Sequence, residues 1–128
     1  MFLLYWDDSK PTPPEEMEAI MAAHNSVLHK AQQRKAYICS EALGGRAYAT
    51  TVRIRDGQTL MTDGPYAETK EVVGGFYILD CRDIDEAIEY ATQLPAAKYA
   101  GVEIRPVMFF PDWPYAVAAD RKRHSMGT

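Results

Sequence analysis

The sequence has few cysteines, no long apolar run and no excess of basic residues, and each absence excludes a class of protein. The two cysteines, Cys39 and Cys81, are isolated and lack CxxC spacing, so they predict neither a zinc site nor a disulfide framework. We expect them to be buried, reduced thiols of a cytoplasmic protein. No apolar run approaches the roughly 18 residues of a membrane span. The N-terminal MFLLYWDD lacks the basic region and cleavage site of a signal peptide.

Positive charge is also scarce. The formal net charge is -4, and a nucleic-acid-binding protein would need a basic face. The short basic run 121–123 is interpreted as part of a solvated tail. The histidines His24, His29 and His124 lack the spacing of metal ligands. Both Gly-Gly pairs fall at strand ends, so no phosphate-binding loop is predicted either. We therefore expect no metal, no cofactor, no nucleic acid and no membrane among the partners.

What the sequence does contain is a regular alternation of strands and amphipathic helices. Apolar periodicity and turn residues divide the chain into strands, helices and a hairpin. We predict strands at 2–6, 36–44, 75–80 and 101–107, helices within 12–35 and 83–94, and a hairpin over 48–64 with Asp56-Gly57 as its two-residue turn.

Both helices carry start signals. Thr12 is the predicted N-cap of the first helix, with Pro13 at the first helical position, and Asp83 is the predicted N-cap of the second. Their apolar faces are predicted from residues at helical spacing. In the first helix these are Met17, Ile20, Met21, Val27, Leu28 and Ala31, with His24 inside the stripe, and in the second Ile84, Ala87, Ile88, Ala91 and Leu94.

The order of elements predicts an α+β fold, namely the ferredoxin-like split βαβ pattern with an inserted β-hairpin. Two helices cover only one face of such a sheet, so we expect a second copy to cover the other face. Residues 1–108 form the predicted domain. Residues 109–128 are interpreted as an aromatic arm and basic tail that packs on the partner or on the edge of the sheet, not as a separate domain.

One long motif resembles a known family. The run Asp63-Gly64-Pro65-Tyr66, followed by AETKE and by Gly74-Gly75, resembles the DGPF-domain branch of the YCII-related family, and the similarity extends over roughly residues 1–108. The resemblance implies a homodimer of the dimeric α/β-barrel type, without an established activity. Some members of that family accompany sigma factors of the extracytoplasmic-function class, and a related protein removes chloride from chloroaromatic compounds without a redox cofactor.

His24 is the candidate catalytic residue. In YCII proteins a helix histidine with an acidic partner has been proposed as the site, and His24 falls at about that position. Glu41, from the strand expected under the helix, or Asp63 would orient it, so that His24 titrates near neutral pH and carries protons. The alternative is a core histidine, neutral and hydrogen-bonded to one hydroxyl or backbone group. His29 lies about 140° further around the helix and cannot join His24 as a metal ligand.

The charged loop after the hairpin is the second candidate site. Its residues could wall a pocket that presents Asp63, Tyr66, Glu68 and Lys70 to a polar ligand. Arg53, on the hairpin, could bind a ligand carboxylate or form ion pairs with the loop acids. The alternative is a turn held by Asp63 and a solvated run of charges.

Together these features predict a homodimeric protein with a small-molecule cleft and cofactor-free acid–base chemistry, such as an elimination or isomerisation. The alternative is a non-enzymatic binding or regulatory module that works with an extracytoplasmic-function sigma factor. The sequence leaves open whether the protein is an enzyme.

Overall fold

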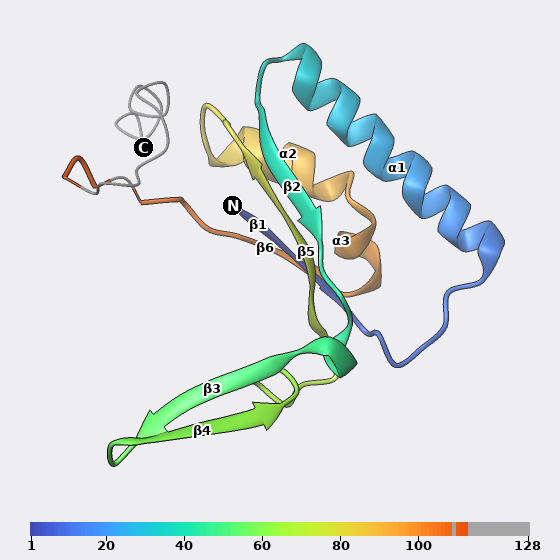
Figure 1. Cartoon of the computed structure of the whole chain (residues 1–128). Coiled ribbons are helices and arrows are strands. Elements are labelled where there is room, and N and C mark those ends of the chain that lie inside the picture. Colours follow the sequence, from blue (N-terminus) through green and yellow to red (C-terminus); the bar gives the residue numbers. More distant parts are fainter. Residues whose placement is uncertain (109, 113–128) are drawn as a thin grey trace.

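A computed structural model describes residues 1–108 and 110–112 (Figure 1). In chain order its elements are β1 (Phe2–Trp6), α1 (Pro14–Gln33), β2 (Tyr37–Ala42), the 3-10 turn η1 (Arg46–Tyr48), β3 (Thr50–Arg55), β4 (Gln58–Asp63), β5 (Val72–Leu79), α2 (Ile84–Thr92), α3 (Pro95–Tyr99) and β6 (Gly101–Ile104).

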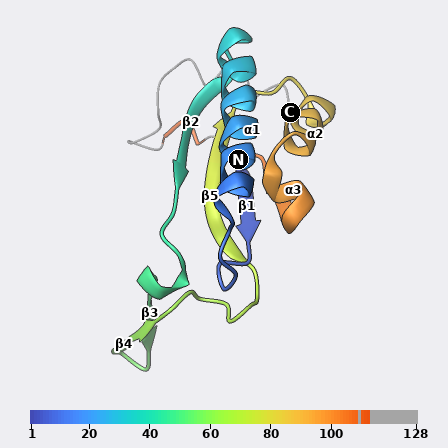
Figure 2. The same cartoon turned by 90° about the vertical axis from the view of Figure 1, so that its right-hand side faces the viewer.

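Four strands form one antiparallel sheet in the order β2-β5-β1-β6, and β3 and β4 form a separate two-stranded sheet. The predicted α+β class is confirmed, and the order of strands and helices along the chain is the predicted one, with the hairpin inserted between β2 and β5. The short helix α3 was not predicted. The helices lie on one side of the four-stranded sheet (Figures 1 and 2).

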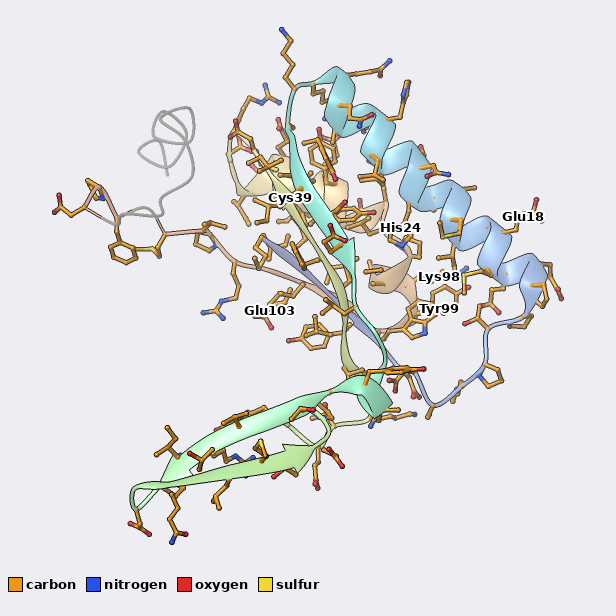
Figure 3. All side chains as sticks on the ribbon, viewed as in Figure 1. Glu18, His24, Cys39, Lys98, Tyr99 and Glu103 are labelled. Carbon is orange, nitrogen blue, oxygen red and sulfur yellow. The ribbon has the colours of Figure 1, made fainter. Side chains whose placement is uncertain are left out.

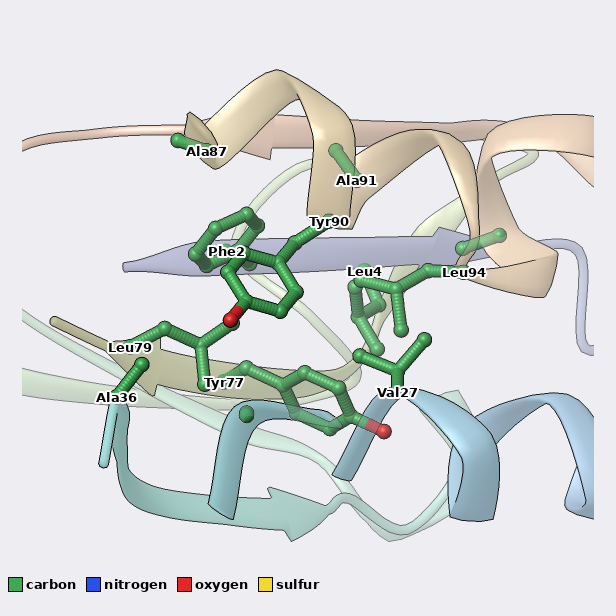
Figure 4. Packing of buried hydrophobic residues seen from close by; sticks show 12 residues of the cluster. Phe2, Leu4, Val27, Ala36, Tyr77, Leu79, Ala87, Tyr90, Ala91 and Leu94 are labelled. Atoms are coloured by element: carbon green, nitrogen blue, oxygen red, sulfur yellow. The ribbon is translucent and has the colours of Figure 1, made fainter. Parts of the chain in front are cut away.

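The core lies between this sheet and the helices (Figure 4). Phe2 and Leu4 of β1 point into it, as alternate residues of a strand do. Tyr77 of β5, Val27 of α1 and Tyr90 of α2 complete its centre, and Tyr90 has no exposed surface. The face of the sheet that carries Tyr77 is therefore the face that packs on α1.

The two predicted helix caps have different outcomes. Asp83 is the N-cap of α2, and its carboxylate accepts the N–H of Glu86 at 2.8 Å, as predicted. The prediction for Thr12 is wrong, because α1 begins at Pro14 and Pro13 is the N-cap residue. A residue that precedes a proline is forced toward extended backbone, and Pro13 accordingly has ψ 147. The Pro13-Pro14 pair thus moves the start of the helix by one residue.

The apolar faces of the helices are only partly those predicted. Ile20, Val27 and Ala31 of α1 are buried, but Met17 and Met21 are 43% and 52% exposed. In α2 the predicted Ile84 and Ile88 are exposed, whereas Ala87 and Ala91 are buried together with Tyr90. The large ring of Tyr90 takes the centre of the interface, so α2 is rotated relative to the predicted face.

The hairpin extends away from the sheet on the side opposite α1 (Figures 1 and 2). Its two strands pair in register up to Arg55 and Gln58, which leaves Asp56 and Gly57 as the turn. These residues have φ of 53° and 76°, as a two-residue hairpin turn of type I′ requires. The predicted hairpin and its turn are confirmed.

The face of the four-stranded sheet away from the helices is called the open face here. Residues directly paired across strands share a face, and pairing joins Phe76 to Leu3 and Glu41, and Ile78 to Cys39. Within the described part of the chain no helix lies on this face.

Cys39 and Cys81 are both free of disulfide bonds. Cys39 lies in β2 and Cys81 shortly after β5, and both are only partly buried, so the prediction of buried thiols is confirmed only in part. Burial raises the pKa of the Cys81 thiol to about 11. The arm predicted over 109–128 lies outside the described residues except for 110–112. In the described part, no helix has both the length and the apolarity that crossing a membrane requires.

Candidate functional site

A pocket of about 710 Å³ lies between the hairpin and the loop that follows it, and is called the loop pocket here. It is lined by Arg46 of η1, Thr51 and Arg53 of β3, Thr62 and Asp63 of β4, and residues 64–66 and 68–70. The residues predicted to bind a ligand, Arg53, Tyr66, Glu68 and Lys70, therefore line one pocket, together with Asp63.

The turn at Gly64 sets the shape of this pocket. Gly64 has φ 114°, a conformation that residues with a Cβ rarely adopt. Its N–H donates to the Ala49 carbonyl at 2.8 Å, and its carbonyl accepts the Thr51 hydroxyl at 2.7 Å. The start of the loop is thus fixed to β3 by backbone and hydroxyl groups.

Arg46 fixes the far end of the loop. Its guanidinium donates to the Asp8 carboxylate at 2.6 Å, to the Thr69 carbonyl at 2.9 Å and to the Lys70 carbonyl. The backbone N–H of Arg46 also donates to Asp8, and this bond together with the ion pair lowers the pKa of the Asp8 carboxyl. One side chain therefore connects three segments that are distant in the sequence.

Arg53 points its guanidinium at an aromatic ring. The guanidinium lies 5.1 Å from the centre of the Tyr66 ring and contacts the Tyr66 carbonyl at 3.5 Å. Among the described residues no ion pair joins Arg53 to Asp63 or Glu68, so the ion pair that the sequence offered as an alternative does not form. The positive charge of Arg53 therefore interacts with the face of the Tyr66 ring and lines the loop pocket.

His24 lies between α1 and the sheet, half-buried (Figure 3). Its Nδ1 is hydrogen-bonded to the Tyr77 hydroxyl, and the two rings meet edge to face with centres 5.8 Å apart. Burial lowers the pKa of His24, and burial is also the main reason that the pKa of Tyr77 is raised to about 12. Both groups are therefore neutral at pH 7.

The structure does not bring the three predicted catalytic residues together within one protomer. Glu41 is exposed on the open face, opposite the face that carries Tyr77 and packs on α1. Asp63 ends β4 and lines the loop pocket, whose lining includes neither His24 nor Glu41. Of the two environments considered for His24, the observed one has a hydroxyl partner, and no carboxylate contributes to its lowered pKa.

Three residues near the loop pocket and near His24 were not predicted from the sequence. Arg46 follows a Gly-Gly pair in a loop, without a charged neighbour that would have marked it as an ion-pair partner. Tyr77 lies in an apolar strand and reads as a core residue. Tyr37, whose hydroxyl is 2.9 Å from the Ser40 hydroxyl, has the same character. Their partners are distant in the sequence or depend on the register of a strand.

The lowered pKa of His24 predicts a stability that depends on pH. Below about pH 6.5 a histidine of the unfolded chain takes up a proton that native His24 resists, so the free energy of unfolding should fall as the pH decreases. Urea unfolding at pH 8 and pH 5.5 measures the fall. We expect a smaller fall for His24→Gln, and the parent's fall for the matched variant of the exposed His29. Equal falls in parent and His24→Gln would contradict the assignment.

The sheet, the helices on one of its faces and the inserted hairpin with its pocket define an α+β protein with a candidate small-molecule site. The model of the YCII-related domain matches residues 1–111. An uncharacterised protein of Rhizobium meliloti (strain 1021) is 36% identical over 118 residues, which cover 84% of this chain and 90% of that protein. The chain belongs to the YCII-related family.

Proposed function

We propose that the protein binds a small anionic molecule in the loop pocket. The observation that carries this proposal is the placement of Arg53, which lines the pocket without a carboxylate partner among the described residues. Lys70 lines the same pocket and adds a second cation, whereas the charge of Arg46 is already paired with Asp8. A carboxylate or phosphate group would pair with Arg53 and Lys70, because a guanidinium suits the planar geometry of such oxyanions.

The ligand proposed for this site carries more than an anionic group. Asp63 and Glu68 line the same pocket and can accept hydrogen bonds from hydroxyl or amino groups. The Tyr66 ring offers an apolar surface. The class that fits is a small hydroxylated or aminated carboxylate or phosphate, and the volume of about 710 Å³ lies in the range of small-molecule sites.

The proposed assembly is a homodimer of ferredoxin-like protomers that together form a dimeric α/β barrel. Its support is the open face, where the apolar Leu3, Phe76 and Ile78 lie on the side of the sheet without helices. The run Asp63-Gly64-Pro65-Tyr66 supports a place in the DGPF branch of the family. A cytoplasmic location stays a prediction from the use of cysteine.

Acid–base chemistry at His24 is the second candidate function. The observation in its favour is a neutral, half-buried imidazole held by a single hydroxyl, an environment in which a histidine can exchange a proton or a hydrogen bond with a substrate. Glu41 and Asp63 were predicted to orient His24. Both lie outside its immediate surroundings in one protomer, so their roles stay predictions.

A binding experiment tests the loop pocket. Thermal shift is measured with a panel of hydroxy acids, amino acids and sugar phosphates, with citrate and inorganic phosphate as simple anions. A ligand that binds the native state raises its stability, by about 2.7 kcal/mol at a hundred times Kd. For the best ligand we expect Arg53→Gln and Lys70→Gln each to weaken binding by about tenfold, the loss of one charge-assisted hydrogen bond.

Arg55→Gln is the matched control, because Arg55 lies in the same strand, does not line the pocket and donates to the Ile54 carbonyl. It should bind as the parent does. If no anion stabilises the protein, or if Arg53→Gln and Arg55→Gln bind alike, the anion site is refuted. Binding of a sigma factor with an empty loop pocket would favour the regulatory alternative.

A further inference from the structure

Four polar side chains gather between α1 and the sheet, and they are called the hydroxyl–imidazole cluster here. His24 contributes the imidazole from α1, Tyr77 a hydroxyl from β5, and Tyr37 and Ser40 hydroxyls from β2. His24 is hydrogen-bonded to Tyr77, and the Tyr37 hydroxyl lies 2.9 Å from the Ser40 hydroxyl. The proximity of Tyr37 contributes to the raised pKa of Tyr77.

Strand register explains why these groups meet. Ser40 is the cross-strand partner of Tyr77, so both lie on the face that packs on α1. Tyr37 pairs with Leu79 of the same face, because the register shifts between Tyr37 and Cys39. The irregularity turns Tyr37 and Ser40 to one side although they are three residues apart.

The ionisable groups around His24 are few. From the sheet, Tyr77 and Tyr37 face α1, and both are phenols. The helix α3, which also packs on α1, carries Lys98 and Tyr99 (Figure 3). Glu16 of α1 lies near Tyr99 and contributes to the raised pKa of that phenol.

The hydroxyl of Tyr77 has one proton and needs an acceptor, since Tyr77 is only 5% exposed. Nδ1 of His24 is its hydrogen-bond partner. A neutral imidazole carries a proton on one nitrogen and accepts at the other. If the Tyr77 O–H donates to Nδ1, the ring proton of His24 must lie on Nε2.

We infer that Tyr77 is the positioning residue of His24, and that it holds the imidazole as the neutral tautomer with its proton on Nε2. In this form His24 presents an N–H donor to a ligand rather than a basic nitrogen. The partner that fits is an uncharged carbonyl compound, whose oxygen accepts a hydrogen bond from Nε2–H. The inference deepens the second candidate function, because it makes His24 a hydrogen-bond donor toward the ligand rather than a base.

The surroundings of His24 suit such a ligand. Met21 and Met17 lie one and two turns before His24 on the same line of α1, and they are 52% and 43% exposed. Methionine side chains adapt to apolar groups of different shape. Apolar side chains therefore flank the imidazole along this line of α1.

Nuclear magnetic resonance tests the inference without a ligand. Long-range nitrogen–proton correlation spectra of the ¹⁵N-histidine protein at pH 8 distinguish the two neutral tautomers, and the His24 signals are identified by their loss in His24→Gln. We expect His24 to be predominantly the Nε2–H form in the parent. In Tyr77→Phe, which keeps the ring and removes the hydroxyl, the Nδ1–H form should rise at least several-fold. Tyr66→Phe, in the loop pocket, is the control and should leave the tautomer unchanged.

Two results would overturn the inference. The first is a parent His24 with its proton on Nδ1, or an equal mixture of tautomers. This measurement does not use Tyr77→Phe, so misfolding of that variant cannot protect the proposal. The second is a folded Tyr77→Phe protein with the parent's tautomer, which would give Tyr77 no positioning role. Neither result depends on anion binding by the loop pocket, so the two proposals fail separately.

Discussion

Phe76→Asp is expected to convert the proposed dimer into a folded monomer. Phe76 lies in β5, at the centre of the open face, with Leu3 and Glu41 as its cross-strand partners. In the proposed dimer a carboxylate at this position would be buried without a cation. Such a charge costs several kcal/mol, so the dissociation constant should rise by about a thousandfold or more. The fold should survive, because Phe76 points away from the core between sheet and helices.

Light scattering and sedimentation at micromolar concentration measure the effect, with circular dichroism as the test of folding. The matched control is Ile88→Asp, which places the same charge on an exposed position of α2, on the helix side of the sheet. It should stay dimeric. A parent protein that is monomeric at these concentrations, or a Phe76→Asp variant that associates as tightly as the parent, would refute the dimer.

The features that the sequence predicted well depend on short-range rules. The hairpin follows from Asp56-Gly57 between alternating strands, and its register then places Thr51 opposite Thr62. The loop from Asp63 to Lys70 is contiguous with that hairpin, so its side chains lie near Arg53, although Arg46 and Asp8 also fix the far end of the loop. A cluster built from neighbouring segments can be predicted because chain connectivity keeps its residues close together. That this cluster binds a ligand stays a prediction.

The pairing of His24 with Glu41 could not be judged in the same way. Strict alternation places Tyr37, Cys39 and Glu41 on one face of their strand. The register shift between Tyr37 and Cys39 breaks that alternation, so Tyr37 packs toward the core whereas Cys39 and Glu41 lie on the open face. Because of this one irregularity, hydroxyl groups lie near His24 where strict alternation predicted a carboxylate. It arises from pairing with β5, which the sequence of β2 does not encode by itself.

The contacts of Arg46 could not be predicted either, because its partners are far from it in the sequence. Its partners Asp8, Thr69 and Lys70 are between 23 and 38 positions away. Only the completed fold brings the loop after β1, the turn η1 and the loop after β4 to one point. Charge in a loop is usually solvated, so the sequence favoured no special role for this arginine.

Arg46→Ala is expected to release the wall of the loop pocket while the four-stranded sheet stays folded. The variant loses the guanidinium bonds to the Thr69 and Lys70 carbonyls and the ion pair with Asp8. Hydrogen bonds to a charged group contribute about 1.5–3 kcal/mol each, so local opening of residues 64–71 should increase by at least about tenfold. Hydrogen–deuterium exchange of the peptides that contain the Thr69 amide measures it. Anion binding should weaken in parallel.

Two further variants test whether the hydrogen bonds of Arg46, rather than its positive charge alone, hold the loop. Arg46→Lys keeps the charge, but one ammonium group cannot reach Asp8 and both carbonyls, so its exchange should resemble that of Arg46→Ala. Gly45→Ala leaves Arg46 intact but places a Cβ 2.9 Å from the Asp8 carboxylate oxygen, so Asp8 must move and the loop should loosen. Arg55→Ala should exchange like the parent. Parent-like exchange in Arg46→Ala would mean that Gly64 and its bonds to β3 hold the loop without the arginine.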